Sequence, residues 1–211
     1  RMDAVTPSMA LSSDIPEIHQ FLLDDFLPSF SLAVALGITR NEAEQRYLKW
    51  TTNCVNSETS VLLRNTSGRI IGIRLCDIEE RGSSHEGRGK LSEKLQTYYR
   101  FIDELDGDKW SYIPSTVDKL WLVEAIAVDK DYRGRGLGKM LMEFGVEKAI
   151  EKGVQGAASD VVANASIAMF AKYGYIPIKE IFHSEYLGQD GLPVFKCPGG
   201  EKVAQCVFKQ F

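Results

Sequence analysis

Glycines and cations crowd one short segment of the chain, 128–139, which reads VDKDYRGRGLGK. Its glycines stand at alternate positions, with basic side chains before and between them: Lys130, Arg133, Gly134, Arg135, Gly136, Gly138 and Lys139. Glycine has no Cβ, so such a turn lets backbone N–H groups approach an anion closely, and a helix that begins there adds partial positive charge. These residue types at this spacing predict a site for a pyrophosphate-like group.

Two common phosphate-binding patterns do not fit this segment. The dinucleotide fingerprint G-x-G-x-x-G would need its third glycine one position beyond Gly138. The mononucleotide loop G-x-x-x-x-G-K-[ST] fails because Arg133 takes its first glycine position and Met140 its Ser/Thr position. The alternative without a ligand is a glycine-rich turn carrying solvated arginines.

An acidic residue interrupts the most apolar stretch of the sequence, 119–128 (KLWLVEAIAV). If this stretch is a strand, the side-chain period of two places Glu124 on the same face as Ile126 and Val128. Burial would raise the pKa of its carboxyl toward neutrality, which suits a general base. The alternative is a structural ion pair or an edge residue that faces water.

The cysteines and histidines show no metal-binding pattern. The 4 cysteines form no C-x-x-C pair and have no histidine at ligand spacing: Cys54, Cys76, Cys197 and Cys206. We therefore expect no metal site, and reduced thiols in a cytoplasmic chain.

Alternating helices and strands must position these groups. Apolar residues at helical spacing predict helices over 14–25, 40–53, 91–105, 136–152 and 164–173, the second with a capping box of Thr39 and Glu42. β-rich runs predict strands over 59–65, 69–77, 119–128, 155–159, 175–182 and 202–208. The polar segment 79–90 predicts a surface loop. The order predicts one α+β domain over 1–211.

Composition excludes several classes of protein. The 211 residues are 44% hydrophobic, and 25 basic against 29 acidic side chains give a net charge of −4. This composition is that of a globular domain, and the mild acidity argues against a nucleic-acid partner. No apolar run reaches the roughly 18 to 20 residues that a membrane span needs. We expect a monomer whose partner is a small molecule.

The glycine segment resembles a known family. Residues 133–138 (RGRGLG) match the [RQ]-x-x-G-x-[GA] acetyl-CoA loop of the GCN5-related N-acetyltransferases. The strand end Ile126-Ala127-Val128 and Tyr132 resemble the family's lead-in, and Asn164, Ala168 and 172–175 (KYGY) resemble its later helix and turn. The likeness spans about 119–182. It implies a mixed, mostly antiparallel sheet that is splayed at the acetyl-CoA strand and flanked by helices.

The resemblance also assigns residues to the acetyl-CoA co-substrate. The strand would pair with the pantetheine arm and the loop would hold the pyrophosphate; the implied residues are Ile126, Ala127, Val128, Arg133, Gly134, Arg135, Gly136, Leu137, Gly138, Lys139 and Asn164. For Asn164, a helix N-cap is the alternative role.

A finer resemblance points to the arylalkylamine N-acetyltransferases of invertebrates, through residues 21–27 (FLLDDFL) and the tail 186–196. It implies Asp25 as a second candidate base and Ser166 as a group near the leaving thiolate. A solvated helix-end acid and a helix-start serine are the respective alternatives. The proton donor is unassigned, because a tyrosine common among acetyltransferases is Phe170 here. An aryl pocket would use Phe26, Phe30, Tyr98, Tyr99 and Phe182.

The function that the resemblance implies is acetyl transfer to a small primary amine such as dopamine, serotonin, tyramine or octopamine. The amine would attack the thioester directly, with general-base help from Glu124 or Asp25. The alternatives are a protein, peptide or polyamine acceptor, and a CoA-binding module without catalysis.

Overall fold

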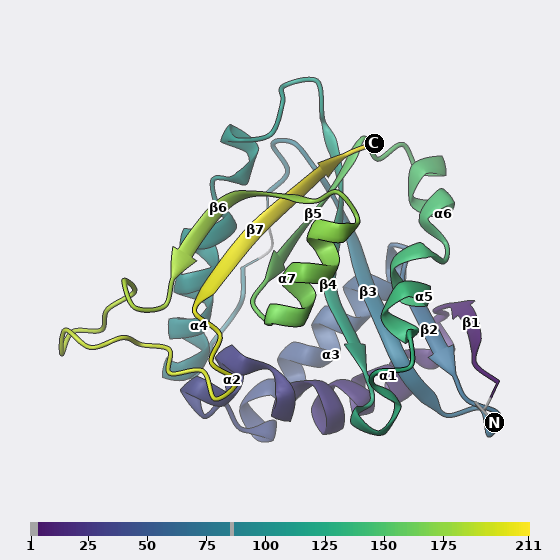
Figure 1. Cartoon of the computed structure of the whole chain (residues 1–211), viewed down its shortest axis with the longest axis horizontal. Coiled ribbons are helices and arrows are strands. Elements are labelled where there is room, and N and C mark those ends of the chain that lie inside the picture. The colour runs from purple at the N-terminus through teal and green to yellow at the C-terminus, as the bar shows by residue number, and fades with distance from the viewer. Residues whose placement is uncertain (1–3, 85–86) are drawn as a thin grey trace.

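The computed structural model describes residues 4–84 and 87–211. The strands in this part of the chain form one sheet of seven, in the order β1-β2-β3-β4-β5-β7-β6 (Figure 1). They are β1 (Thr6–Met9), β2 (Val61–Arg64), β3 (Ile70–Glu80), β4 (Lys119–Val128), β5 (Gly156–Val161), β6 (Ile176–Phe182) and β7 (Val203–Gln210). Only β1 lies outside the predicted strands, while β3 runs past its predicted end and takes Glu79 and Glu80 from the predicted loop. Residues 85 and 86 of that loop lie outside the described residues.

The sheet is antiparallel except where β4 meets β5. These two strands run parallel and pair only at Leu120 with Gly156, Trp121 with Ala157 and Leu122 with Ala158. Beyond that point β4 keeps β3 as a partner but no longer pairs with β5. The predicted mostly antiparallel sheet, splayed at this strand, is therefore confirmed.

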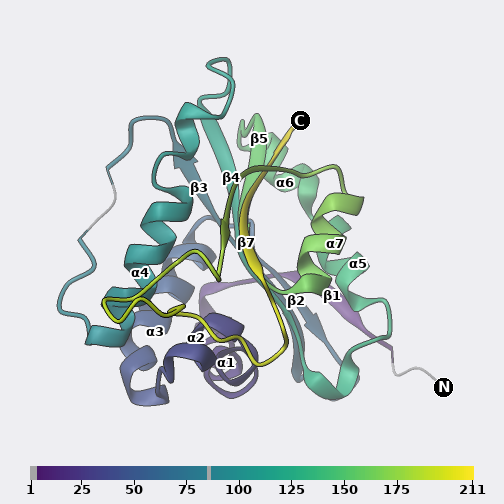
Figure 2. The same ribbon diagram turned by 60° about the vertical axis from the view of Figure 1, so that its left-hand side comes forward.

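Helices cover both faces of the sheet, as Figure 2 shows. One layer holds α1 (Ile15–Phe21), α2 (Ser31–Leu36), α3 (Arg40–Asn56) and α4 (Glu93–Asp106); the other holds α5 (Leu137–Glu143), α6 (Val146–Glu151) and α7 (Asn164–Lys172). Trp121 and Val123 of β4 pack in the second layer with Met142 and Phe170, whereas Ala125 packs in the first layer with the cluster around α1 and α3. The core thus lies on both sides of β4.

The predicted capping box fixes where α3 begins. Thr39 Oγ1 accepts from Glu42 N at 3.3 Å, and Thr39 N donates to Glu42 Oε2 at 2.8 Å. Each residue satisfies an N–H that the first helical turn leaves unpaired. The helix therefore starts at Arg40, and this start fixes the position along α3 from which Trp50 faces β4.

Three predicted helices differ in detail. The helix predicted over 136–152 is two helices, because Phe144 is extended and Gly145 takes a left-handed φ of 71° between α5 and α6. The first predicted helix contains α1 and then a π-helical turn, Leu22–Phe26. The N-cap of α7 is Ala163, and Asn164 is the first helical residue, so the N-cap role for Asn164 is wrong.

Candidate active site

The glycine segment forms the connection from β4 to α5, as predicted. Gly134 and Gly136 have left-handed φ values of 74° and 79°, and a Cβ at either would meet no atom within 4 Å. Gly138 differs, because a Cβ there would lie 3.1 Å from Met169 Sδ of α7. Two glycines therefore leave open space along the loop, and the third lets α5 and α7 pack closely.

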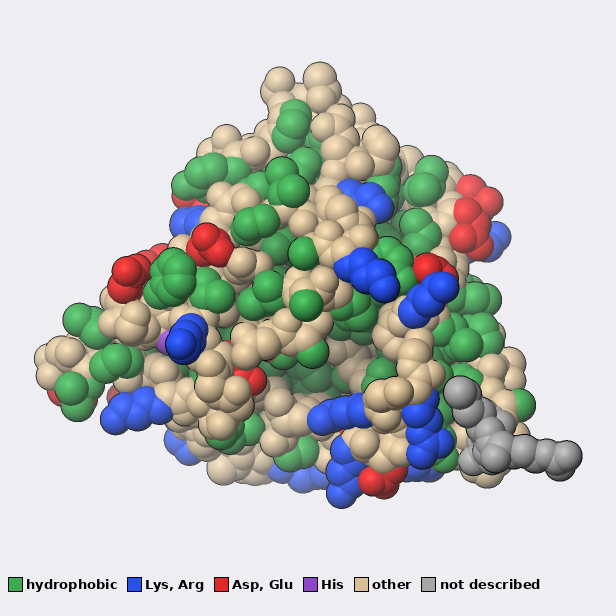
Figure 3. Space-filling model, viewed as in Figure 1, with side chains coloured by type: hydrophobic (Ala, Val, Ile, Leu, Met, Phe, Trp, Pro, Cys, Tyr) green, Lys and Arg blue, Asp and Glu red, His purple; other side chains and the backbone are tan. Residues whose placement is uncertain are grey.

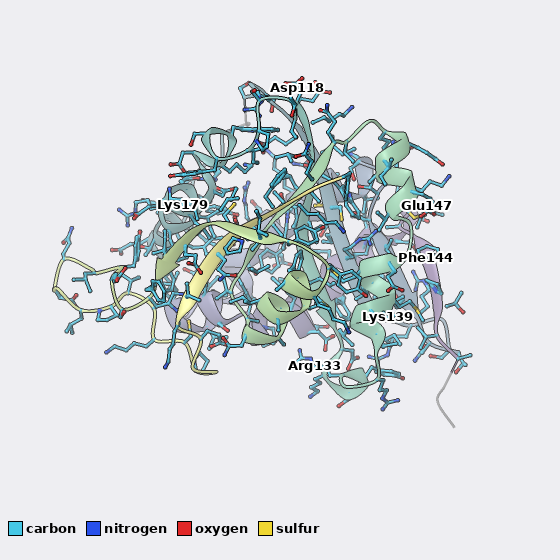
Figure 4. The ribbon with its side chains drawn as sticks, turned by 45° about the horizontal axis from the view of Figure 1, so that its top comes forward. Asp118, Arg133, Lys139, Phe144, Glu147 and Lys179 are labelled. Atoms are coloured by element: carbon cyan, nitrogen blue, oxygen red, sulfur yellow. The ribbon has the colours of Figure 1, made fainter. Side chains whose placement is uncertain are left out.

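Basic side chains surround this loop on the outside of the molecule. Arg133 Nε donates to Val128 O at 3.0 Å, and an Arg135 amino group donates to Asp131 O at 2.8 Å. Both side chains are exposed, as is Lys139. Figure 3 shows basic side chains gathered at this end of the molecule, and Figure 4 places Arg133 and Lys139 there. The loop thus presents cations to the space that the glycines leave open.

A buried aspartate, which sequence reasoning passed over, anchors the loop to the rest of the fold. Asp129 is 2% exposed; its carboxylate accepts from Asp131 N at 2.8 Å and pairs with Arg69, 2.9 Å away on the β2–β3 hairpin. From the same hairpin, Asn65 Nδ2 donates to the Tyr132 hydroxyl at 3.1 Å. An acid directly after a buried strand was the signal available in the sequence.

The open edge of β4 begins beside Val123. Ser159 Oγ of β5 donates to Val123 O at 2.7 Å, so a side-chain hydrogen bond joins the two strands at the point where they part. Ile126, Ala127 and Val128 lie beyond this point, half-buried and paired only with β3. The predicted donor-binding residues of β4 therefore flank the splay and lead into the glycine loop.

Glu124 lies where β4 and β5 part, in a β-bulge. Leu75 of β3 pairs with Ala125 and Cys76 with Val123, which leaves Glu124 as the extra residue of β4. Bulges re-aim side chains. Glu124 consequently points into the first helix layer, where Trp50 Nε1 of α3 donates to its Oε2 at 3.2 Å.

The bulge corrects the predicted orientation of this side chain. Ile126 packs in the second helix layer with the clusters around α5 and α7, whereas Ala125 and Ala127 pack against the cluster that holds Trp50. Glu124 therefore does not share a face with Ile126. The period of two holds on either side of the bulge, but the extra residue breaks it at 124.

The surroundings of Glu124 favour its neutral form. Its side chain is accessible to solvent, yet protein surrounds it closely enough that desolvation raises the pKa to about 7, with repulsion from Asp77 adding to the rise. The Trp50 N–H bond acts in the opposite direction, because it stabilises the carboxylate. A solvent-accessible carboxyl with a pKa near neutrality is suited to accept a proton.

Further acids lie in the same helix layer. Burial raises the pKa values of Asp106 on α4 and Asp160 on β5, and repulsion between these two and from Glu124 contributes to the rise at Asp160. The ammonium of Lys109 opposes these shifts; it lies 3.1 Å from Glu79 and 3.4 Å from Asp106. Asp77 and Asp106 thus disfavour the ionised form of Glu124, and Lys109 favours it.

An aromatic cluster lies against the same carboxylate. Phe26 and Phe30 stack with ring centroids 5.0 Å apart, and the Trp50 ring lies 5.9 Å from Phe26 and 5.5 Å from Tyr47. Tyr98 of α4 packs edge-on against Phe30 at 6.0 Å. We call these five residues the aromatic cluster.

The structure brings together most, but not all, of the residues predicted for an aryl pocket. Phe26, Phe30 and Tyr98 belong to the aromatic cluster, and Tyr99 contacts Tyr98 with centroids 5.0 Å apart. Phe182 instead lines a separate recess of about 390 Å³ beside the β6–β7 connection. Tyr47 and Trp50, which prediction missed, lie one helical turn apart on α3, and their i, i+3 spacing was the available signal.

Asp25 occupies a different environment from Glu124. It lies in the π-helical turn after α1, an irregularity often found at functional sites. Burial and then repulsion from Asp129 raise the pKa of Asp25, while Arg69 lowers it. Asp129 and Arg69 belong to the anchor of the glycine loop, so the two predicted acids respond to different sets of charges.

The α7 residues flank the splay from the second helix layer. Asn164 is exposed and Ser166 half-buried in the first turn of α7. Phe170 is buried against Tyr175 with ring centroids 4.9 Å apart, and the Tyr173 hydroxyl donates to Glu143 Oε1 at 3.0 Å. Tyr173 thus points toward α5, and the role of Ser166 near the leaving thiolate stays a prediction.

A sheet splayed between β4 and β5, with a glycine loop directly after β4, is the arrangement that the sequence resemblance to acetyltransferases implies. The family model described as "Acetyltransferase (GNAT) family" matches residues 19–175. The chain therefore belongs to the GNAT family of N-acetyltransferases. Comparison with curated proteins gives no match.

Solved structures share this fold over nearly the whole chain. Arylalkylamine N-acetyltransferase 2 from Aedes aegypti superposes with a TM-score of 0.86 at 21% identity, covering 99% of both chains. A Drosophila melanogaster polyamine N-acetyltransferase that forms N-acetylagmatine gives 0.79 at 18% identity, covering 99% of this chain and 100% of its own. Arabidopsis thaliana NAA60 in complex with acetyl-CoA gives 0.58 at 15%, covering 99% of both.

Among residues 4–84 and 87–211, no helix combines the length and the apolar character needed to cross a membrane.

Proposed function

We propose that this chain transfers the acetyl group of acetyl-CoA to a small primary amine, with arylalkylamines as the acceptor class. One observation carries the proposal: a solvent-accessible carboxyl with a pKa of about 7, Glu124, lies where β4 and β5 part and beside the aromatic cluster. A base, an open strand edge and an aromatic surface thus meet at one point.

The donor side is supported by the glycine loop. The space beside Gly134 and Gly136 fits an anionic ligand, and the exposed cations Arg133, Arg135 and Lys139 suit a pyrophosphate. In this proposal, 126–128 hold the pantetheine arm through the backbone edge left open by β5. In this proposal Leu137, Gly138 and Asn164 contribute to the same donor site from α5 and α7.

The chemistry follows from these positions. Glu124 takes a proton from the acceptor ammonium, and the neutral nitrogen bonds to the acetyl carbonyl carbon as the carbon–sulfur bond breaks. The bonded nitrogen then gives up its second proton, which passes through a water molecule to the departing thiolate; in this proposal Ser166 orders that water. Proton transfer by a positioned side chain contributes about 10²- to 10⁴-fold to such a rate.

A polyamine is the second candidate acceptor. Asp77 repels the ionised form of Glu124, and an acidic group beside the proposed base also attracts an acceptor with a second ammonium. The aromatic cluster favours the aryl class, because ring contacts add about 0.5 to 1.5 kcal/mol beyond buried area.

The test is an acceptor panel with acetyl-CoA, following the release of free CoA thiol. Tyramine, dopamine, serotonin and octopamine should react with higher kcat/KM than agmatine or spermidine, and a peptide N-terminus should react least. Turnover of polyamines alone would replace the aryl proposal, and the absence of turnover with every amine would refute amine acetylation.

A further inference from the structure

Trp50 is the residue through which the first helix layer contacts Glu124. Its indole nitrogen donates to Glu124 Oε2 at 3.2 Å, across 74 positions of sequence. Its ring also joins the aromatic cluster, 5.9 Å from Phe26 and 5.5 Å from Tyr47. One side chain therefore touches both the carboxylate and the aromatic surface.

The fold fixes the positions of both partners in this contact, Trp50 and Glu124. The Thr39–Glu42 capping box sets the start of α3, and Cys54, one turn after Trp50, is buried in the cluster that includes Ile73 and Leu75 of β3. On the other side, the bulge of β4 turns Glu124 toward α3. The contact thus depends on the placement of two elements rather than on a flexible surface side chain.

We propose that Trp50 is a positioning residue, which holds one oxygen of Glu124 and leaves the other directed toward the acceptor amine along the aromatic cluster. An indole N–H is a donor only, so it engages the ionised carboxylate and does not compete for the proton. This inference rests on the proposed function, since the role of Glu124 as base belongs to that proposal.

Several other groups act on the same carboxyl. Those that influence Glu124, or respond to it, come from four elements packed around it and from the turn after α4: Cys54 on α3, Cys76 and Asp77 on β3, Tyr98 and Asp106 on α4, Lys109, and Asp160 on β5. The proposal therefore needs a variant that changes the Trp50 N–H and leaves all of these in place.

The sharpest variant replaces Trp50 with β-(3-benzothienyl)alanine, introduced at that codon alone. Sulfur takes the place of the N–H in a ring of nearly the same shape, so the aromatic packing stays and the donor is lost. Trp50→Phe is the conventional partner variant. Trp110→Phe is the matched control, because Trp110 Nε1 donates to a different carboxylate, Glu79 Oε1, at 2.5 Å.

The first readout does not require activity. In protein labelled with ¹³C at the glutamate carboxyl carbons, the Glu124 signal is assigned by its loss in Glu124→Gln. The two Trp50 variants should raise its titration midpoint by on the order of one pH unit, because the bond that favours the ionised form is gone. The Trp110 control should leave the midpoint in place. An unchanged midpoint in both Trp50 variants would overturn the proposal.

The second readout separates positioning from titration. A rise of one pH unit from about 7 reduces the ionised fraction at pH 7 roughly fivefold. A larger loss of kcat that persists at high pH, with KM for acetyl-CoA unchanged, is the signature of a displaced carboxylate. A kcat that recovers fully at high pH would contradict positioning. If the wild type acetylates no amine, the proposed function fails, and the titration still decides whether Trp50 holds Glu124.

Discussion

The proposed donor side and the proposed acceptor side of this molecule are built in different ways. Most of the proposed donor side is continuous in sequence: the end of β4, the glycine loop and α5 follow one another within residues 126–143, and Asn164 of α7 is added to them. The acceptor side brings together α3, α4, a π-helical turn and one bulged residue of β4. A local motif can bind a donor common to a family, while an assembled surface can change its acceptor without disturbing that motif.

This contrast predicts that substitutions on the two sides will have different kinetic effects. Changes in the glycine loop should act on acetyl-CoA, and changes around Glu124 should act on the acceptor and on the rate. Three substitutions test this separation, beginning with the one of largest expected effect.

Glu124→Gln should reduce kcat by about 10²- to 10⁴-fold and leave KM for acetyl-CoA unchanged. It should also raise Tm at pH 8, because a carboxyl whose folded pKa lies near 7, above its usual 4.5, costs stability when ionised. The gain should fade as pH falls from about 7 and be absent well below 4.5, where the carboxyl is protonated in both states. Steady-state kinetics and thermal melts measure the two effects. If the variant retains most of the activity, the general base is a different residue, and Asp25 is the next candidate.

Gly136→Ala should weaken acetyl-CoA binding about tenfold. Alanine at a left-handed φ costs about 1 to 2 kcal/mol, and its Cβ would enter the space left beside the loop. Gly153→Ala is the matched control, since Gly153 has a φ of 82° and equally open surroundings but lies after α6. Calorimetric titration with CoA should find weakened binding in the first variant alone. Equal affinities in the two variants would mean that the loop does not hold the co-substrate.

Phe30→Leu should have the smallest effect, a loss of up to about tenfold in kcat/KM for tyramine. The loss comes from the stacking with Phe26 and the edge contact with Tyr98. The kcat/KM for agmatine should change far less, and KM for acetyl-CoA should stay the same. Comparison of the two acceptors measures this, and an equal loss for both would indicate a general packing defect rather than aryl recognition.

The sequence predicts local elements of the structure far better than contacts between distant segments. β4 is predicted over its full length, because a short apolar run between turn signals is typical of a buried strand. The capping box of α3 was likewise predicted, since it depends on residues only three apart. The family resemblance rested on the same local patterns.

The errors arose where distant segments decide the outcome. The bulge at Glu124 exists because Leu75 and Cys76 of β3 pair on either side of it, which β4 alone does not specify. The break after α5 depends on Gly145, where a Cβ would lie 2.9 Å from Met9 Sδ of the unpredicted strand β1. Trp50 reaches Glu124 only through the packing of α3 on the sheet.

The pH dependence of kcat/KM tests the central claim most directly. With the titration of the amine taken into account, the wild-type profile should rise through an apparent pKa near 7 and level off. Asp77→Asn should move this limb to lower pH, because it removes a charge that repels the ionised form. Glu124→Gln should abolish the limb. A limb that survives in Glu124→Gln at the same pH would contradict Glu124 as the base.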